Sequence, residues 1–229
     1  MHKIKTTLLL SLISFTVFSQ VNLNLTNNEN FEVVKMLTKK TNQKGLDLSQ
    51  ISGSPYASET FALAKVERTN EKATAELLLR YNGYNDEIEI GKITNQEVSE
   101  EALLKDKNLK ATFNDKTYQF ISFKSKKGEA TEGYLIVLFE GKKYRLYRQD
   151  KKKLSEGRIA KTSLDKDIPP RFRDVETFYV AQGENTPIEV DLKMKSIRKQ
   201  LLSEDLAKSK EVKKIKSEEH LIAFFKGLE

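Results

Sequence analysis

Between Thr60 and Gln149 the chain repeats one pattern, in which runs of alternating apolar and polar residues are separated by turn residues. The clearest runs are ATAELLLRYN at 73–82, KTYQFISF at 116–123 and GYLIVLFE at 133–140. Because side chains on a β-strand point alternately to opposite faces, this alternation predicts half-buried strands. At least six strands with spacings of roughly 8–12 residues favour an antiparallel sandwich or open barrel over a parallel sheet with intervening helices.

Two hairpins can be placed from their turn residues. Asn82-Gly83 favours a tight turn, and the following NDEIEIGKI alternates acids with isoleucines, so it can pair with the strand before the turn. Gly141-Lys142 joins GYLIVLFE to KYRLYRQ at 143–149. The first arm of this second hairpin is apolar on both faces, which predicts an interior strand covered on both sides.

The pattern changes after Pro169-Pro170. ETFYVA and TPIEVDL add one or two strands, and from Leu192 onward apolar residues recur near helical spacing among lysines. Ser217 and Gly227 are expected to begin and end the last helix. Another short helix is expected over 99–105, capped by the Ser99 hydroxyl. The predicted class is α+β: a mainly antiparallel β domain of about 7–9 strands, followed by two or three amphipathic helices packed on it.

The first residues have the layout of a secretory signal. Lys3 and Lys5 precede an uncharged, mostly apolar run from Leu8 to Phe18, which is followed by the small residue Ser19. The run is much shorter than the roughly 20 residues that a membrane-spanning helix needs. We expect cleavage between Ser19 and Gln20 and a soluble mature protein without a transmembrane segment, in the periplasm rather than the medium.

The expected organisation has four parts: the signal peptide at 1–19, a polar segment at 20–50, a β-rich domain at 51–190 and a helical segment at 191–229. The chain has no cysteine, which excludes disulfides, thiolate metal sites and a cysteine nucleophile. We expect no metal site and no cofactor. Oligomeric state cannot be inferred from this pattern.

Positive charge is mild and spread along the chain. The formal net charge is +7, and lysines are interspersed with acids, which is typical of a solvated surface rather than a nucleic-acid interface. The densest basic groups are Lys151-Lys152-Lys153 and Lys213-Lys214 with Lys216. We interpret both as exposed faces, with a patch for acidic lipid or polysaccharide as the alternative.

Catalytic signatures are scarce. A Ser-His-Asp triad in the mature chain would need His220, which we interpret as a solvated helix residue, and the sequence has neither a G-x-S-x-G elbow nor a glycine-rich phosphate loop. Carboxylates could still hydrolyse glycosidic bonds, and Asp86, Glu87 and Glu89 are the candidates. Acids that alternate with isoleucines are, however, typical of the solvent face of a strand.

The densest polar and aromatic stretch surrounds Asn82-Gly83, and a second group follows the two prolines. Tyrosines could stack on a sugar or peptide, although tyrosine is also a favoured strand residue. Two arginine side chains in an extended segment could bind an anion. The candidate ligand-binding residues are Arg80, Tyr81, Tyr84, Asp86, Glu87, Arg171 and Arg173.

Several of these segments occur in a recognisable order. GSPYASETF, LLLRYNGYNDEIEI, GYLIVLFEGKKYRLY, IPPRFRDVETFYV and the lysine-rich tail together resemble a family of uncharacterised exported proteins of Bacteroidota. The resemblance covers most of the chain after Gly53. It implies export, but it implies no activity, substrate, cofactor or functional residue. Where the family pattern has two tyrosines, this chain has Phe178-Tyr179.

Three functions remain open from the sequence. The leading hypothesis is a non-enzymatic module that binds a protein or glycan of the cell envelope. The first alternative is a carboxylate-dependent hydrolase acting on envelope or extracellular glycan. The second alternative is an anion-binding surface protein that binds lipopolysaccharide or acidic polysaccharide through its cations.

Overall fold

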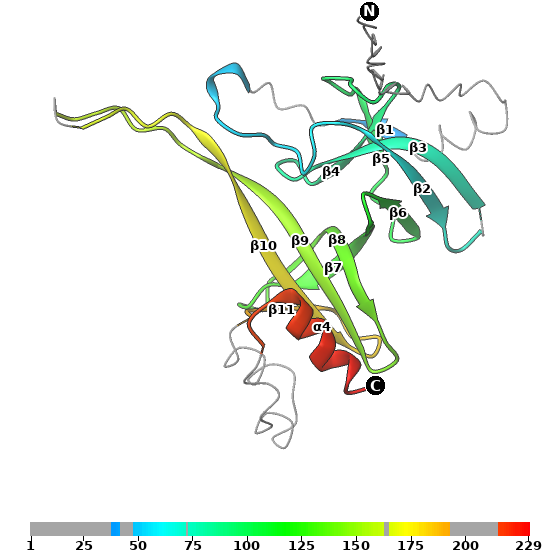
Figure 1. The fold of residues 1–229 in the computed structure, drawn as a ribbon. Coiled ribbons are helices and arrows are strands. Elements are labelled where there is room, and N and C mark those ends of the chain that lie inside the picture. Colours follow the sequence, from blue (N-terminus) through cyan, green and yellow to red (C-terminus); the bar gives the residue numbers. More distant parts are fainter. Residues whose placement is uncertain (1–37, 42–47, 72, 163–164, 193–214) are drawn as a thin grey trace, which may run out of the picture.

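The computed structural model describes residues 38–41, 48–71, 73–162, 165–192 and 215–229. These residues form eleven strands, a short 3-10 helix and one α-helix (Figure 1). The elements are β1 (Thr38–Lys40), η1 (Leu48–Gln50), β2 (Ala62–Arg68), β3 (Ala73–Asn82), β4 (Glu87–Gly91), β5 (Glu101–Leu103), β6 (Leu109–Phe113), β7 (Lys116–Lys124), β8 (Ala130–Glu140), β9 (Tyr144–Ser155), β10 (Arg171–Gln182), β11 (Ile188–Val190) and α4 (Glu218–Lys226).

All eleven strands belong to one hydrogen-bonded sheet, in the order β1-β5-β4-β3-β2-β6-β7-β11-β10-β9-β8. The pairs are antiparallel except β11 with β7, which is parallel through a bridge between Ile188 and Lys124. Because β7 also pairs with β8, the strands β7, β11, β10, β9 and β8 close into a ring. The remaining strands extend from β7 as an open sheet.

Two hydrophobic cores meet at the β7–β8 hairpin. Tyr134 and Ile136 of β8 pack in the core of the open sheet, whereas Leu135 packs in a second core with Tyr147 and Tyr179. Successive residues of β8 therefore enter different cores, as expected from the alternation of side chains along a strand. The prediction of an interior strand covered on both faces is confirmed.

Helix α4 covers the outer face of β9 and β10 (Figure 1). Ser217 caps it by accepting a hydrogen bond from the His220 amide at 3.4 Å, and Gly227 ends it, as predicted. Leu221 and Phe225 are fully buried against the sheet. Neither helix in the described part of the chain is long and apolar enough to cross a membrane.

The longest hairpin, formed by β9 and β10, extends beyond the body as a two-stranded ribbon (Figure 1). Its ladder runs without a break from the pair Tyr144–Gln182 to the pair Ser155–Arg171. Ser52 holds the ribbon at its base, because the amide of Phe172 donates to the Ser52 carbonyl at 2.9 Å. On the other edge, the Lys152 amide donates to the Gly83 carbonyl at 3.0 Å.

The structure corrects two predictions of secondary structure. The α+β class is wrong, because the described residues form a mostly antiparallel sheet with more strands than expected and only one α-helix. Residues 193–214, part of the segment expected to be helical, lie outside the described part. The helix expected over 99–105 is instead the strand β5, because the Ser99 hydroxyl donates to the Ile90 carbonyl at 2.5 Å and holds this segment beside β4.

Candidate functional site

Arg80, the first candidate, is a buried member of the sheet. Its Nη2 atom lies 2.7 Å from Oε2 of Glu89, and the guanidinium carbon lies 3.5 Å from the centroid of the Tyr56 ring. Only 2% of Arg80 is exposed. The guanidinium also donates to three backbone carbonyls, those of Glu59, Gln96 and Glu97. These contacts give Arg80 a structural role in joining β3 to the loops beside it.

Asp86 organises the turn between β3 and β4. Its backbone has φ 53°, in the left-handed region, and its carboxylate accepts from the Tyr81 hydroxyl at 2.8 Å and the Tyr134 amide at 3.2 Å. Tyr81 is buried, and its pKa is raised well above the usual value, first by burial and then by the nearby Asp86 charge. Asp86 thus joins the turn to β8.

Glu87 and Glu89 are buried, so the interpretation of these acids as a solvent face is wrong. Glu87 lies 2.5 Å from the Lys39 amine, and Glu89 accepts from the Asn82 amide at 2.9 Å in addition to its contact with Arg80. Every residue of β4 is buried. Each acid has a partner within the fold, because an unpaired charge would be costly there.

The second candidate group, Arg171 and Arg173, lies on the projecting ribbon. In the β9–β10 ladder, Arg173 is opposite Lys153, Arg171 is opposite Ser155 and Val175 is opposite Lys151. Directly opposite residues of an antiparallel pair point to the same face. The ladder therefore gathers four cations on one face of the ribbon, which we call the cation face: Lys151, Lys153, Arg171 and Arg173.

The two faces of the ribbon differ in their surroundings. On the face opposite the cations, Phe172 is buried and its ring packs edge-on against that of Tyr84, with centroids 5.4 Å apart. Lys153, Arg171 and Arg173 are exposed. The rungs of the cation face carry no acidic residue, and none of its cations forms an ion pair with an acid in the described part of the chain.

The candidate residues thus divide into two sets. Arg80, Tyr81, Asp86 and Glu87 are held in the body by partners of their own, and Tyr84 packs on the base of the ribbon. Arg171 and Arg173 lie on the cation face. The sequence did not predict that the strand with these arginines pairs with the strand that carries Lys151 and Lys153. The basic run at 151–153 was the only signal for it.

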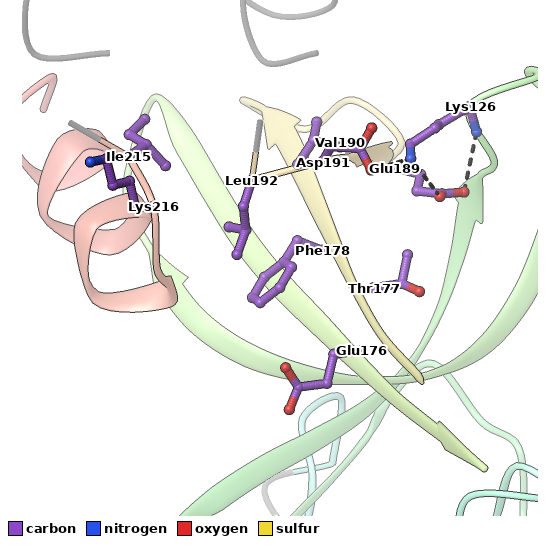
Figure 2. A pocket seen from close by; sticks show the side chains of 10 residues that line it. All are labelled: Lys126, Glu176, Thr177, Phe178, Glu189, Val190, Asp191, Leu192, Ile215 and Lys216. Atoms are coloured by element: carbon purple, nitrogen blue, oxygen red, sulfur yellow. Dashed lines mark hydrogen bonds and ion pairs between the residues drawn. The ribbon is translucent and has the colours of Figure 1, made fainter. Parts of the chain in front are cut away.

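Two hollows lined by residues of the described ranges contain none of the candidate residues. The larger, of about 680 Å³, lies between β10, β11 and the residues before α4 (Figure 2). Its polar side is closed by Lys126, which is ion-paired with Glu189 and Asp191, and Phe178 forms part of its apolar side. The smaller, of about 250 Å³, is lined in part by Arg145 and Tyr147.

The remaining residues singled out in the sequence are His220 and the basic group around Lys216. His220 is exposed on α4, in agreement with its interpretation as a solvated residue. No group of three or more histidine or acidic side chains in the described ranges is arranged to hold a metal ion. Lys216 is exposed, whereas Lys213 and Lys214 lie outside the described residues.

Comparison with family models, curated proteins and solved structures finds no match to this chain.

Proposed function

We propose that this chain is an exported binding protein whose cation face binds an envelope component carrying several closely spaced anionic groups. The observation that supports the proposal is the ladder that places Lys153 opposite Arg173, with Lys151 and Arg171 on the same face. Phosphate, sulfate and carboxylate groups share the required chemistry, because each accepts hydrogen bonds from lysine and arginine.

The spacing of the four cations suits a multivalent ligand. Directly opposite residues in the ladder are about 4.5–5.5 Å apart, and side chains two residues apart on one strand are about 7 Å apart. A single small anion would meet only one or two of these side chains. A surface or polymer with repeated anionic groups can contact all four, because the cation face has no acid of its own.

Binding to a soluble polyanion tests this proposal. The protein is passed over immobilised heparin in a salt gradient, beside a variant with Lys151, Lys153, Arg171 and Arg173 changed to glutamine. At roughly 0.2–1 kcal/mol per exposed charge pair, the loss of four pairs should weaken binding by between about fourfold and several hundredfold. The matched control changes Lys92, Lys124, Lys127 and Lys142 to glutamine, which removes the same charge from exposed positions elsewhere. Equal weakening in both variants, or binding insensitive to salt, would contradict the proposal.

Export is the second part of the proposal, and periplasmic residence goes with it. It is supported by the charged start, the apolar run and the small residue Ser19. The mass of the protein recovered from cells should correspond to a chain beginning at Gln20. Recovery of only the full-length chain from the cytoplasm would refute export while leaving the ligand-binding test unaffected.

A further inference from the structure

The sheet has a gap beside β7, between β6 and β11. The β6–β7 ladder ends at Gln119, and β11 joins β7 only at Lys124. Backbone groups alternate in direction along a strand, and the Lys124 amide points toward β11, so the amides and carbonyls of Phe120 and Ser122 point to the same edge. No strand in the described part of the chain pairs with these two residues along that edge.

Pro187 explains why β11 does not continue along β7. Its carbonyl accepts from the Lys124 amide at 2.8 Å. In a parallel ladder the next bond, to the Ser122 carbonyl, would need an amide hydrogen on residue 187, and proline has none. Residues 184–187 therefore run beside β7 without extending the ladder, and the smaller hollow, of about 250 Å³, lies between the two segments.

Arg145 lines the same hollow, and its guanidinium is fixed in place. Its Nε atom donates to the Gly183 carbonyl at 3.0 Å, and Nη2 donates to the Asn185 carbonyl at 3.4 Å. Nη1 lies 3.7 Å from Oε2 of Glu184, whose side chain is 95% exposed. Because so exposed an ion pair contributes little, a ligand carboxylate can replace Glu184 at Nη1.

Tyr147 adds a second donor beside Arg145. It lies two residues farther along β9, on the same face, and only 2% of it is exposed. Burial raises the pKa of Tyr147, so its hydroxyl keeps its proton at neutral pH. Phe120, Ile121 and Pro187 supply apolar contacts around these polar groups. The hollow thus combines an open strand edge, a fixed cation and apolar side chains.

We propose that this hollow binds the carboxyl-terminal end of an extended peptide, whose backbone pairs with β7 at Phe120 and Ser122 and whose carboxylate lies on Arg145. At roughly 30 Å³ for each water-sized group, the hollow has room for on the order of eight non-hydrogen atoms, or the backbone of about two residues. Strand addition at an open edge and capture of a terminal carboxylate are recurring ways of binding peptides.

The site is separate from the cation face and goes beyond the proposed function. About 20 Å of strand β9 separates Arg145 from Lys151. The two sites also differ in what they recognise, because the cation face meets repeated anionic groups, whereas the hollow takes one carboxylate together with a peptide backbone. A small acid such as acetate would leave the edge of β7 unused.

Titration with related dipeptides tests the inference. The probes are N-acetyl-alanyl-valine, its C-terminal amide, and two versions of the acid, each methylated on one backbone nitrogen. Binding is followed through the backbone NMR signals of the protein. The wild type should bind the acid with a dissociation constant on the order of 0.1–1 mM, with shifts at Phe120 and Ser122.

The modified probes separate the two parts of the site. The amide should bind about tenfold more weakly or worse, because it loses the charge-assisted hydrogen bond to Arg145. One of the two methylated acids should bind at least about fivefold more weakly, since it lacks the hydrogen that pairs with β7.

Variants of the protein provide the matching test. Arg145→Gln should bind the acid and the amide equally, and Tyr147→Phe, which keeps the ring, should weaken binding of the acid about two- to tenfold. Arg158→Gln is the matched control, because Arg158 is exposed on the ribbon, and this variant should prefer the acid as the wild type does. Thermal unfolding should show that the variants are folded.

Three results would overturn the inference. They are equal binding of the acid and the amide by the wild type, undiminished binding of both methylated acids, and binding of acetate as tight as that of the dipeptide acid. None of these results involves heparin or the cation face, so the proposed function and this inference fail separately.

Discussion

The Arg80 guanidinium and the Glu89 carboxylate form a buried ion pair, with Nη2 and Oε2 2.7 Å apart, between adjacent strands β3 and β4. Tyr56 and Phe61 lie on the guanidinium, with ring centroids 3.5 and 4.2 Å from its central carbon. The Asn82 amide binds the other oxygen of Glu89. The residues that looked most like a ligand site from the sequence therefore hold the sheet together.

Removing either member of this pair should destabilise the fold strongly. Arg80→Met or Glu89→Gln leaves one buried partner uncompensated, and the expected loss in the free energy of unfolding is about 3–5 kcal/mol. Urea denaturation measures it. The exposed pair Lys65–Glu67 is the control, and Glu67→Gln should change stability by about 1 kcal/mol or less. A small effect of Arg80→Met would contradict the structural role given to this residue.

Gly83 allows the ribbon to approach the β3–β4 turn. A Cβ atom at this position would lie 2.9 Å from the Asp150 carbonyl oxygen and 3.1 Å from the Lys152 nitrogen. Because these are backbone atoms, Gly83→Ala should cost about 1–3 kcal/mol through displacement of β9. Gly227→Ala is the matched control, since its Cβ would lie 3.4 Å or more from any neighbour. Equal unfolding midpoints for the two variants would show that the contact is unimportant.

Alkaline pH should destabilise the protein through its buried tyrosines. Burial, followed by the nearby charges of Asp86 or Asp150, raises the pKa of Tyr81, Tyr118 and Tyr134. Above about pH 10 the unfolded chain loses tyrosine protons that the folded chain keeps, so stability falls as the pH rises. Tyrosinate absorbance should appear together with unfolding. Full ionisation of all tyrosines near pH 10 in a chain that remains folded would contradict this prediction.

The Glu229 side chain binds the turn between β8 and β9. Its carboxylate accepts from the amides of Lys142, Lys143 and Tyr144 at 2.7, 3.0 and 3.1 Å. Loss of hydration works to raise the pKa of Glu229, but these hydrogen bonds outweigh it and the pKa lies below its usual value. The contribution to stability is therefore present near neutral pH and is lost as the pH falls through the lowered pKa.

Glu229→Gln should remove that acid dependence. Denaturation in urea at a series of pH values from 7 to below about 4 should show a stability difference from the wild type that shrinks as the pH falls. Glu184→Gln is the control, because the Glu184 side chain is almost fully exposed and lies 3.7 Å from Arg145. A difference that does not change with pH would show that the charge of Glu229 is not what binds the turn.

Local alternation was enough to predict most strands. The segments 73–82 and 116–123 form strands close to the predicted limits, because their period-two pattern matches the two faces of a sheet. The turn at Asn114-Asp115 has positive φ at both residues, as such a tight turn requires. The closure of the ring by β7 with β8 and β11 depends on distant pairing, for which the local sequence carries no signal.

The candidate site was harder to predict, since polar residues have the same pattern whether they face solvent or a buried partner. Glu87 and Glu89 alternate with isoleucines as exposed acids would, but Lys39 and Arg80 pair with them from other strands. Arg171 and Arg173 were recognised as candidates, and 151–153 as a basic run. Only the strand register shows that they share a face.

The hairpin of β7 and β8 has one face in each hydrophobic core, with Tyr134 and Ile136 on one side and Leu135 on the other. Its loss would expose both cores to water at once. Neither the ring of strands nor the open sheet can therefore be excised as an autonomous folding unit. We expect one melting transition for the whole body. Completion of either core also has to wait until the hairpin has been synthesised and paired, well past the middle of the chain.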